Sequence, residues 1–288
     1  MKIKRWITGL WIVLLTAAVT QAASPVWKIS DGTRHLYIGG TIHVLAKDDY
    51  PLPKAFATAY ADSHTLVFEA DMGQMENPEF AGQMMAQMVY ADGTTLESLL
   101  TPPTFKDLNQ FTAARNIPVA AVNQFKPGMV MVALTLAEIQ RLGVGGAGVD
   151  EFYFAKGRKD GRPMDFLEAP MDQVAFLAGI GIGQEDEMIA YILRDVEKLP
   201  TLLPVMKKAW KTGDNDLLYR ETLAPLKKEY PDLYFKLMVK RNLAWMDRIM
   251  EMMATPEVEF ILVGAGHLAG DRGLLALLKE KGFSAGNL

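Results

Sequence analysis

The chain has 288 residues, of which 50% are hydrophobic and 22% charged, and it contains no cysteine. This composition is typical of a globular protein and excludes the disordered and fibrous classes, and the length fits one large domain, alone or with an inserted subdomain. The absence of cysteine excludes disulfides, thiolate metal sites and cysteine nucleophiles.

Residues 1–22 have the pattern of a secretory signal peptide. Three basic residues among the first five precede an apolar run at 6–19, and small residues follow it. A run of 14 residues is too short for a comfortable membrane span, although an uncleaved anchor is the alternative. Cleavage after Ala22 reduces the 30 Lys and Arg to 27 against 34 Asp and Glu, and a net charge of −7 disfavours nucleic acid as a partner. We therefore expect export, to the bacterial periplasm, and no stable membrane span after cleavage.

Short apolar runs and longer helical patterns alternate in the remaining domain, 23–288. The pattern indicates an α/β fold built on a layered sheet, not a sandwich. The predicted strands are 34–39, 65–69, 118–122, 163–168 and 257–263. The predicted helices are 74–90, 94–100, 105–115 and 128–142, followed by a helical insertion or cap at about 185–254 that we expect to be interrupted at Pro200, Pro204, Gly213, Pro225 and Pro231.

The positions of two glycine-rich segments, and the number of methionines, are explained by ordinary structural roles. The segment 143–148 fits G-x-G-x-x-G but follows a predicted helix, where a dinucleotide site needs a strand. The segment 264–270 follows a strand, but the 18 residues after it are too few for the rest of such a site. The 17 methionines indicate core packing, with copper or haem binding as the alternative.

Two of the four histidines end a Gly-x-x-His quartet directly after a predicted strand. The quartets are Gly40 to His43 and Gly264 to His267. Ligands bind beyond the carboxyl ends of strands in open α/β sheets, and glycine there lets backbone and ligand approach closely. The two histidines could therefore face each other, whereas turn glycines with hydrogen-bonded histidines are the plainer alternative.

Carboxylates end two other strands at the equivalent edge. Glu69 and Asp71 stand in "LVFEAD", and Glu168 stands in "MDFLEA". A carboxylate that closes an apolar strand needs a cation, a helix N-terminus or a substrate. Two histidines with one or two carboxylates can hold a divalent metal, and histidine with glutamate can alternatively activate a water directly.

Arg241 and Asn242 lie on or beside the apolar stripe of a predicted helix near 233–253. An arginine on the buried side of a helix usually pairs with a carboxylate. Structural pairing and binding of an oxyanion or a substrate carboxylate both fit this position.

Several segments in order along the chain resemble the TraB/GumN/Tiki family. They are "YIGGTIHVL", "LVFEAD", "GVDEFYFAKGRKDGRPMDFLEAPMDQVAFL", "KRNLAWMDRIM" and "FILVGAGHLAGDRGLLALLKEKGF". The resemblance implies a layered α/β/α fold with a mostly parallel central sheet, like that of erythromycin esterase and the ChaN haem-binding protein. For the Tiki branch it implies a metal-dependent protease that uses manganese or cobalt, with zinc as a further candidate. The matching motif residues are His43, Glu69 and His267, supported by Glu168, Arg241 and Asn242.

These features together predict an exported metal-dependent hydrolase, in particular a peptidase, that acts on a peptide or small molecule. His43, His267 and Glu69 would hold the metal, and Glu168 or Asp71 would act as a general base or support. Arg241 would bind the oxyanion or a substrate carboxylate, with Gly40, Asn242 and Gly264 supporting the site. The alternatives are a non-catalytic protein that binds haem or another small ligand, and a metal-free esterase. The oligomeric state does not follow from the sequence.

Overall fold

The computed structural model describes residues 24–288, so the predicted signal peptide lies outside the described residues. A six-stranded sheet has the order β6-β4-β7-β2-β1-β8. Its strands are β1 (Val26–Ser30), β2 (His35–Thr41), β4 (Thr65–Phe68), β6 (Met164–Phe166), β7 (Glu259–Gly264) and β8 (Ser284–Asn287). The four strands β6, β4, β7 and β2 run parallel, and β1 pairs antiparallel with both β2 and β8.

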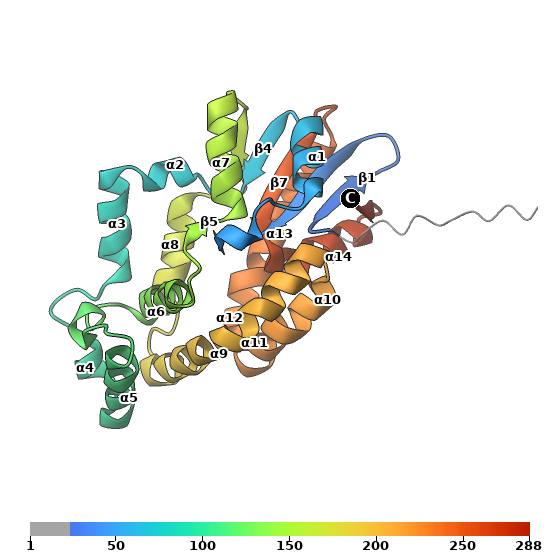
Figure 1. The fold of residues 1–288 in the computed structure, drawn as a ribbon. Coiled ribbons are helices and arrows are strands. Elements are labelled where there is room, and N and C mark those ends of the chain that lie inside the picture. The colour runs from blue at the N-terminus through green and yellow to red at the C-terminus, as the bar shows by residue number, and fades with distance from the viewer. Residues whose placement is uncertain (1–23) are drawn as a thin grey trace, which may run out of the picture.

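Helices cover both faces of this sheet (Figure 1). The two faces are apolar because side chains alternate along a strand: Phe260 and Leu262 pack against α1 (Lys54–Asp62) and α7 (Val149–Asp160). Ile261 and Val263 pack on the opposite side against α13 (Lys240–Met253) and α14 (Leu274–Glu280). The predicted layered α/β fold with a mostly parallel sheet is confirmed.

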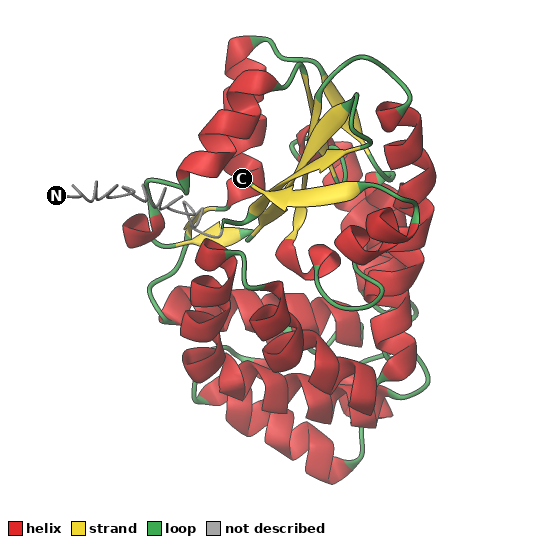
Figure 2. Cartoon of the chain, turned by 90° about the vertical axis from the view of Figure 1, so that its right-hand side faces the viewer, coloured by secondary structure: helices red, strands yellow, loops and turns green. Residues whose placement is uncertain are grey.

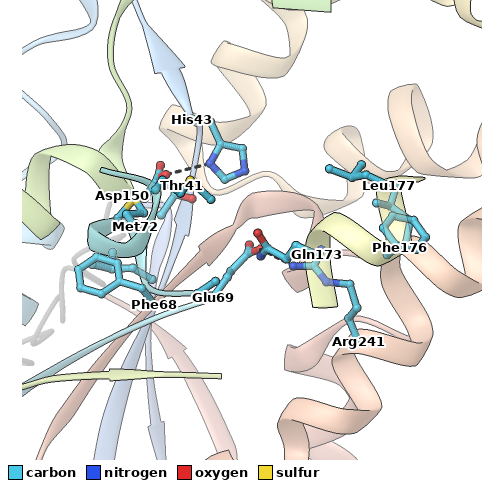
Figure 3. A pocket seen from close by; sticks show the side chains of 14 residues that line it. Thr41, His43, Phe68, Glu69, Met72, Asp150, Gln173, Phe176, Leu177 and Arg241 are labelled. Carbon is cyan, nitrogen blue, oxygen red and sulfur yellow. Dashed lines mark hydrogen bonds and ion pairs between the residues drawn. The ribbon is translucent and has the colours of Figure 1, made fainter. Parts of the chain in front are cut away.

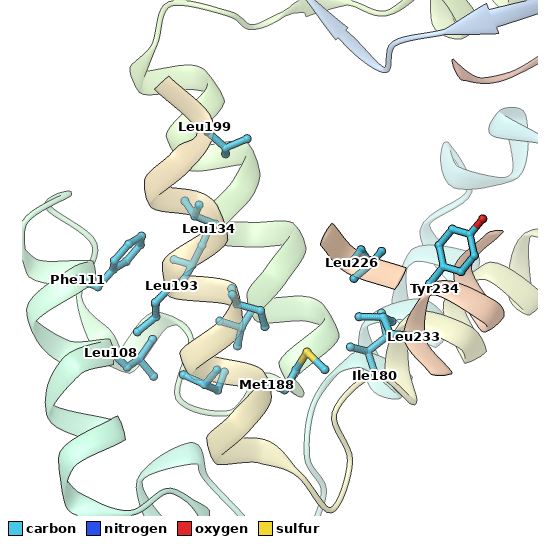
Figure 4. Packing of buried hydrophobic residues seen from close by; sticks show 14 of the residues in the cluster. Leu108, Phe111, Leu134, Ile180, Met188, Leu193, Leu199, Leu226, Leu233 and Tyr234 are labelled. Atoms are coloured by element: carbon cyan, nitrogen blue, oxygen red, sulfur yellow. The ribbon is translucent and has the colours of Figure 1, made fainter. Parts of the chain in front are cut away.

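Helices alone form the other end of the molecule, away from the sheet (Figure 2). Their shared apolar core includes Leu108, Leu134, Leu193 and Leu226 (Figure 4). The helices that contribute to it are α4 (Leu96–Leu99), α5 (Pro102–Ala113), α6 (Pro127–Arg141), α9 (Glu185–Thr212), α11 (Ala224–Glu229) and α12 (Pro231–Tyr234).

The remaining elements are short or connect these two parts. They are β3 (Val44–Leu45) and β5 (Gly146–Ala147), which pair with each other, and α2 (Met72–Met75), α3 (Pro78–Met88), α8 (Pro170–Ala178) and α10 (Asn215–Leu218), with short 3-10 or π turns η1 (Lys47–Asp49), η2 (Val119–Ala121), η3 (Tyr219–Leu223), η4 (Phe235–Val239) and η5 (Ala265–Leu268). None of the helices within 24–288 combines the length and the hydropathy that a membrane span requires.

Four of the five predicted strands are present within two residues of their predicted ends, as β2, β4, β6 and β7. The prediction at 118–122 is wrong, because this segment forms η2 between α5 and α6, and Val122 is buried in the helical core. Strands β1 and β8 were not predicted from the sequence.

Two helix predictions are also wrong. The predicted helix 74–90 is two helices, because Asn77 accepts a hydrogen bond from the Glu79 amide and caps α3, with Pro78 at its first position. Conversely, α9 continues through Pro200 and Pro204. Leu199 and Leu203 are buried along this stretch, and their packing offsets the hydrogen bonds that the two prolines cannot make.

Candidate active site

The four parallel strands end at one edge of the sheet, and each is followed by one of the predicted site residues. His43 follows β2 and Glu69 directly follows β4. Glu168 lies two residues after β6, and His267 lies in η5 directly after β7. Since these strands are neighbours in the sheet, the fold brings together side chains that are up to 224 residues apart in sequence.

Arg241, from the first turn of α13, connects three of these side chains. Its Nη2 donates to Glu69 Oε2 at 2.6 Å and to Glu168 Oε1 at 2.5 Å. Its Nη1 lies 3.0 Å from Nε2 of His267. The side chain of Arg241 is 16% exposed and those of Glu69 and Glu168 are each 13% exposed, so this is a largely buried group of charges. The pairing that the sequence allowed for Arg241 is therefore present.

Glu168 has a full set of hydrogen-bond donors around it. Besides Arg241, Trp245 Nε1 donates to its Oε2 at 3.0 Å and Gln173 Nε2 donates to its Oε1 at 2.7 Å. The Arg241 guanidinium also lies over the Trp245 ring, 4.7 Å from the ring centre. Glu168 thus fixes the position of Arg241 and has little acceptor capacity left for further hydrogen bonds.

Asn242 determines which nitrogen of His267 carries the proton. Its Nδ2 donates to the backbone oxygens of His267 and Arg272 at 3.2 and 2.9 Å, so its Oδ1 is the acceptor for Nδ1 of His267 at 2.6 Å. Nδ1 of His267 is therefore protonated and Nε2 carries the lone pair that faces Arg241. Asn242 is 1% exposed and His267 is 4% exposed, so both are buried.

His43 has an equivalent partner in Asp150, which lies in the first turn of α7. Nδ1 of His43 lies 2.9 Å from Asp150 Oδ2 and donates to it, so Nε2 is the nitrogen left for a ligand. The Asp150 carboxylate raises the pKa of His43 to about 9. His43 therefore offers a lone pair on Nε2 only after this proton has left.

The buried groups have pKa values that keep their charges fixed near neutral pH. Burial opposes ionisation of Glu69, but the nearby His267, Arg241 and His43 together outweigh it and lower the pKa of Glu69 to about 2. Burial lowers the pKa of His267 to about 3, although the Glu69 carboxylate opposes this shift. Glu69 is thus ionised and His267 neutral at pH 7.

The glycines of the two quartets lie where larger residues would crowd the site. The Gly264 amide donates to Glu69 Oε1 at 2.7 Å, and a Cβ at Gly264 would lie 3.3 Å from that oxygen. A Cβ at Gly40 would lie 3.1 Å from Cβ of Ala265, and the Gly40 carbonyl accepts a hydrogen bond from Trp210 Nε1 at 2.7 Å. Both glycines provide the clearance that close backbone approach requires.

A cavity of about 320 Å³ is lined on its polar side by His43, Glu69, Asp150, Gln173 and Arg241. Figure 3 shows His43 on one side, with Glu69, Gln173 and Arg241 across from it. The remaining wall is mainly apolar and contains Met72, Met75, Phe176, Leu177 and Leu237. The site thus combines a charged floor with an apolar wall, as ligand pockets commonly do.

By chemical type, the nitrogen and oxygen atoms at this site suit the divalent metal that the resemblance implies. Nε2 of neutral His43 and of His267, together with the Glu69 carboxylate, are suitable ligands, and each imidazole has an oxygen behind its Nδ1. However, no three His, Asp or Glu side chains within residues 24–288 are arranged as a group that could hold a metal. Arg241 bonds to both His267 and Glu69, so an ion could bind there only after the guanidinium had left Nε2 of His267.

Of the predicted side chains, His43, Glu69 and Arg241 line the cavity. Glu168 and His267 do not line it but contact Arg241, and Asn242 bonds to His267. Asp71 belongs to neither set. Its side chain accepts from the Gly73 amide at 2.9 Å and caps α2. Conversely, Asp150, Gln173 and Trp245 contact the site but were not predicted from the sequence. Each lies in a helix and not at a strand end, and the only signal was its presence in the segments that carry the family resemblance.

Comparison with known proteins gives a consistent result along the whole domain. A sequence model of the TraB/PrgY/gumN family matches residues 25–285. The uncharacterized protein YbaP of Escherichia coli strain K12 is 24% identical over 255 residues, which cover 86% of this chain and 89% of YbaP. YbaP of Shigella flexneri matches with the same identity and coverage. No solved structure matches the chain.

Proposed function

The chain belongs to the TraB/PrgY/gumN family, and we propose that it is an exported, metal-dependent hydrolase that cleaves peptides. The observation that carries this proposal is the matched pair of imidazoles, His43 and His267. Each has Nδ1 bonded to an oxygen, from Asp150 or Asn242. Nε2 of His267 lies 4.0 Å from Glu69 Oε1, and a Cβ at Gly264 would lie within 4 Å of both Glu69 Oε1 and Nε2 of His43. Oriented histidines with a carboxylate between them are typical of a catalytic divalent metal site.

In this proposal His43, His267 and Glu69 hold manganese, cobalt or zinc, which supplies a Lewis acid and a water of lowered pKa. Asp150 and Asn242 keep the two rings oriented. Arg241, released from His267 but still bonded to Glu168, stabilises negative charge that develops on the substrate carbonyl oxygen. The apolar wall excludes water from the reacting group.

The first test is metal binding followed by activity. Purified protein without residues 1–22 is stripped with EDTA, titrated calorimetrically with Mn²⁺, Co²⁺ and Zn²⁺, and assayed with a peptide library for each metal. We expect one site per chain and metal-dependent cleavage, both lost in His43→Ala. His64→Ala is the matched control, because the His64 side chain is exposed and, among residues 24–288, its only hydrogen bond is to Thr65 at 3.2 Å, with Glu257 at 3.9 Å. Absence of both binding and cleavage in the unmodified protein would refute the proposal.

The apolar cavity wall favours a second candidate function, a non-catalytic protein that binds haem or another small ligand. Met72 and Met75 line the same cavity as His43. A haem titration that gave a Soret shift lost in His43→Ala, without any peptide cleavage, would support it. Cleavage that persists in EDTA would instead support a metal-free esterase in which His43 and Glu69 act directly.

Export to the periplasm is part of the proposal and rests on the sequence pattern of residues 1–22. Cell fractionation, followed by sequencing of the N-terminus of the mature protein, tests this part of the proposal. We expect the protein in the periplasmic fraction, beginning at Ala23. A chain that stays in the cytoplasm at full length would refute this part alone.

A further inference from the structure

Two residues that line the cavity each have a buried polar atom with no hydrogen-bond partner among the described residues. These atoms are Thr41 Oγ1, at the end of β2, and Asp150 Oδ1, in the first turn of α7. Thr41 is 3% exposed, and both residues line the cavity. A buried acceptor without a donor costs about 1–3 kcal/mol, so such atoms indicate a missing partner.

The two atoms belong to one part of the cavity. His43 follows Thr41 by two residues, and its Nδ1 bonds to the other oxygen of the same Asp150 carboxylate at 2.9 Å. Figure 3 shows Thr41 and Asp150 on the His43 side of the cavity, apart from Arg241. A ligand group at this position would therefore lie next to the proposed reacting centre without contacting the guanidinium.

The chemistry of these atoms selects the kind of ligand. A carboxylate oxygen and a hydroxyl oxygen both accept hydrogen bonds, and the carboxylate adds a negative charge. A group with several donors and a positive charge satisfies both atoms, and a primary ammonium group has three donors. A divalent metal ion is a poorer match at this position, because these two atoms offer only one carboxylate oxygen and one hydroxyl oxygen, fewer protein ligands than such an ion usually takes.

The geometry points to a subsite for a primary ammonium group, formed by Asp150 Oδ1 and Thr41 Oγ1, which would bind the free amino terminus of the substrate. This inference deepens the proposed function and rests on it for the reaction, because it makes the hydrolase an aminopeptidase. The binding of the ammonium group itself does not depend on cleavage. A lysine side chain carries the same group, so the test separates these two sources.

The experiment is calorimetric binding to the EDTA-treated protein, so that no hydrolysis occurs. The probes are L-leucinamide, N-acetyl-L-leucinamide and N-acetyl-L-lysinamide, since leucine suits the apolar wall. We expect leucinamide to bind roughly 10- to 100-fold more tightly than its acetylated form, the range for hydrogen bonds to a charged group. Equal binding of these two probes would overturn the inference, because the buried atoms would then hold only ordered water.

Two variants and a control locate the effect. Asp150→Asn keeps an oxygen acceptor for His43 but removes the charge, and Thr41→Val removes only the hydroxyl. We expect Asp150→Asn to abolish the preference for leucinamide and Thr41→Val to reduce it about tenfold. Thr58→Val is the matched control and should leave the preference unchanged, because Thr58 is exposed on α1 and its hydroxyl bonds, within the described part of the chain, only to the Lys54 carbonyl. A preference that survives in both site variants would overturn the inference.

The lysine probe and a cleavage assay complete the test. Tighter binding of N-acetyl-lysinamide than of leucinamide would support an ammonium subsite but overturn the assignment to the amino terminus. In the metal-loaded protein, we expect cleavage of peptides with a free amino terminus and at least tenfold slower cleavage of their acetylated forms. Leucinamide binding without any cleavage would refute the proposed hydrolase while leaving the subsite in place. Equal cleavage of both peptide forms would overturn the subsite for the amino terminus and leave the proposed hydrolase in place.

Discussion

Replacing Arg241 with methionine tests whether the buried charges at the sheet edge hold the fold together. The guanidinium bonds to Glu69, Glu168 and His267, and its removal leaves two carboxylates without their cation in a largely buried position. Breaking a buried ion pair by removing one partner costs about 3–5 kcal/mol. We therefore expect Arg241→Met to lose this much free energy of unfolding, measured by urea denaturation in EDTA at pH 7.

Arg248→Met is the matched control on the same helix. Arg248 bonds to Asp165 at 2.6 Å, but its side chain is 45% exposed, and such surface pairs contribute about 0–1 kcal/mol. If Arg241→Met loses no more than the control, the proposed energetic role of Arg241 is wrong. A second measurement separates stability from metal binding. Added Mn²⁺ should stabilise Arg241→Met more than the unmodified protein, because the ion then meets no competing guanidinium at Glu69.

Two further predictions concern pH and packing. Because the ion must displace the proton of His43, whose pKa is about 9, metal affinity should rise about tenfold per pH unit from pH 6 to 8, measured by calorimetry. Asp150→Asn should flatten this dependence above pH 7, and a pH-independent affinity in the unmodified protein would contradict the prediction. Gly128→Ala should lower the free energy of unfolding, measured by urea denaturation, by about 2 kcal/mol or more, because the added Cβ would overlap the Leu177 carbonyl. Gly82→Ala, in α3 with open space around it, should instead be neutral or stabilising, and equal losses would refute the packing argument.

The sequence predicted the site residues that follow strands because strand ends are a local signal. A short apolar run that stops at a glycine or a carboxylate marks the edge of a parallel sheet, so His43, Glu69, Glu168 and His267 could be placed together. Their neighbouring order in the sheet was not predictable, because β7 inserts between β2 and β4 from the far end of the chain. Strand pairing over such separations is decided by the whole fold.

The partners of those residues could not be predicted for the same physical reason. Asp150 and Trp245 reach the site because α7 and α13 dock on opposite faces of the sheet. Helix docking depends on side-chain packing between distant segments, which no local pattern encodes. The error at 118–122 has a related origin: Val122 is apolar because it packs into a helical core, and a short apolar run alone does not distinguish that environment from a strand.

The charges around the cavity indicate why this site should attract cations. At pH 7 the carboxylates of Glu69, Glu168 and Asp150 face two positive charges, those of Arg241 and protonated His43, which leaves one negative charge in excess. A bound ammonium group would balance this charge. A divalent ion that displaced the His43 proton would balance it equally, because two charges enter and one leaves. Small anions should therefore bind weakly to the ion-free protein and more tightly once a metal is present. A phosphate titration with and without Mn²⁺ measures this difference, and equal phosphate affinity in the two states would argue against a metal in this cavity.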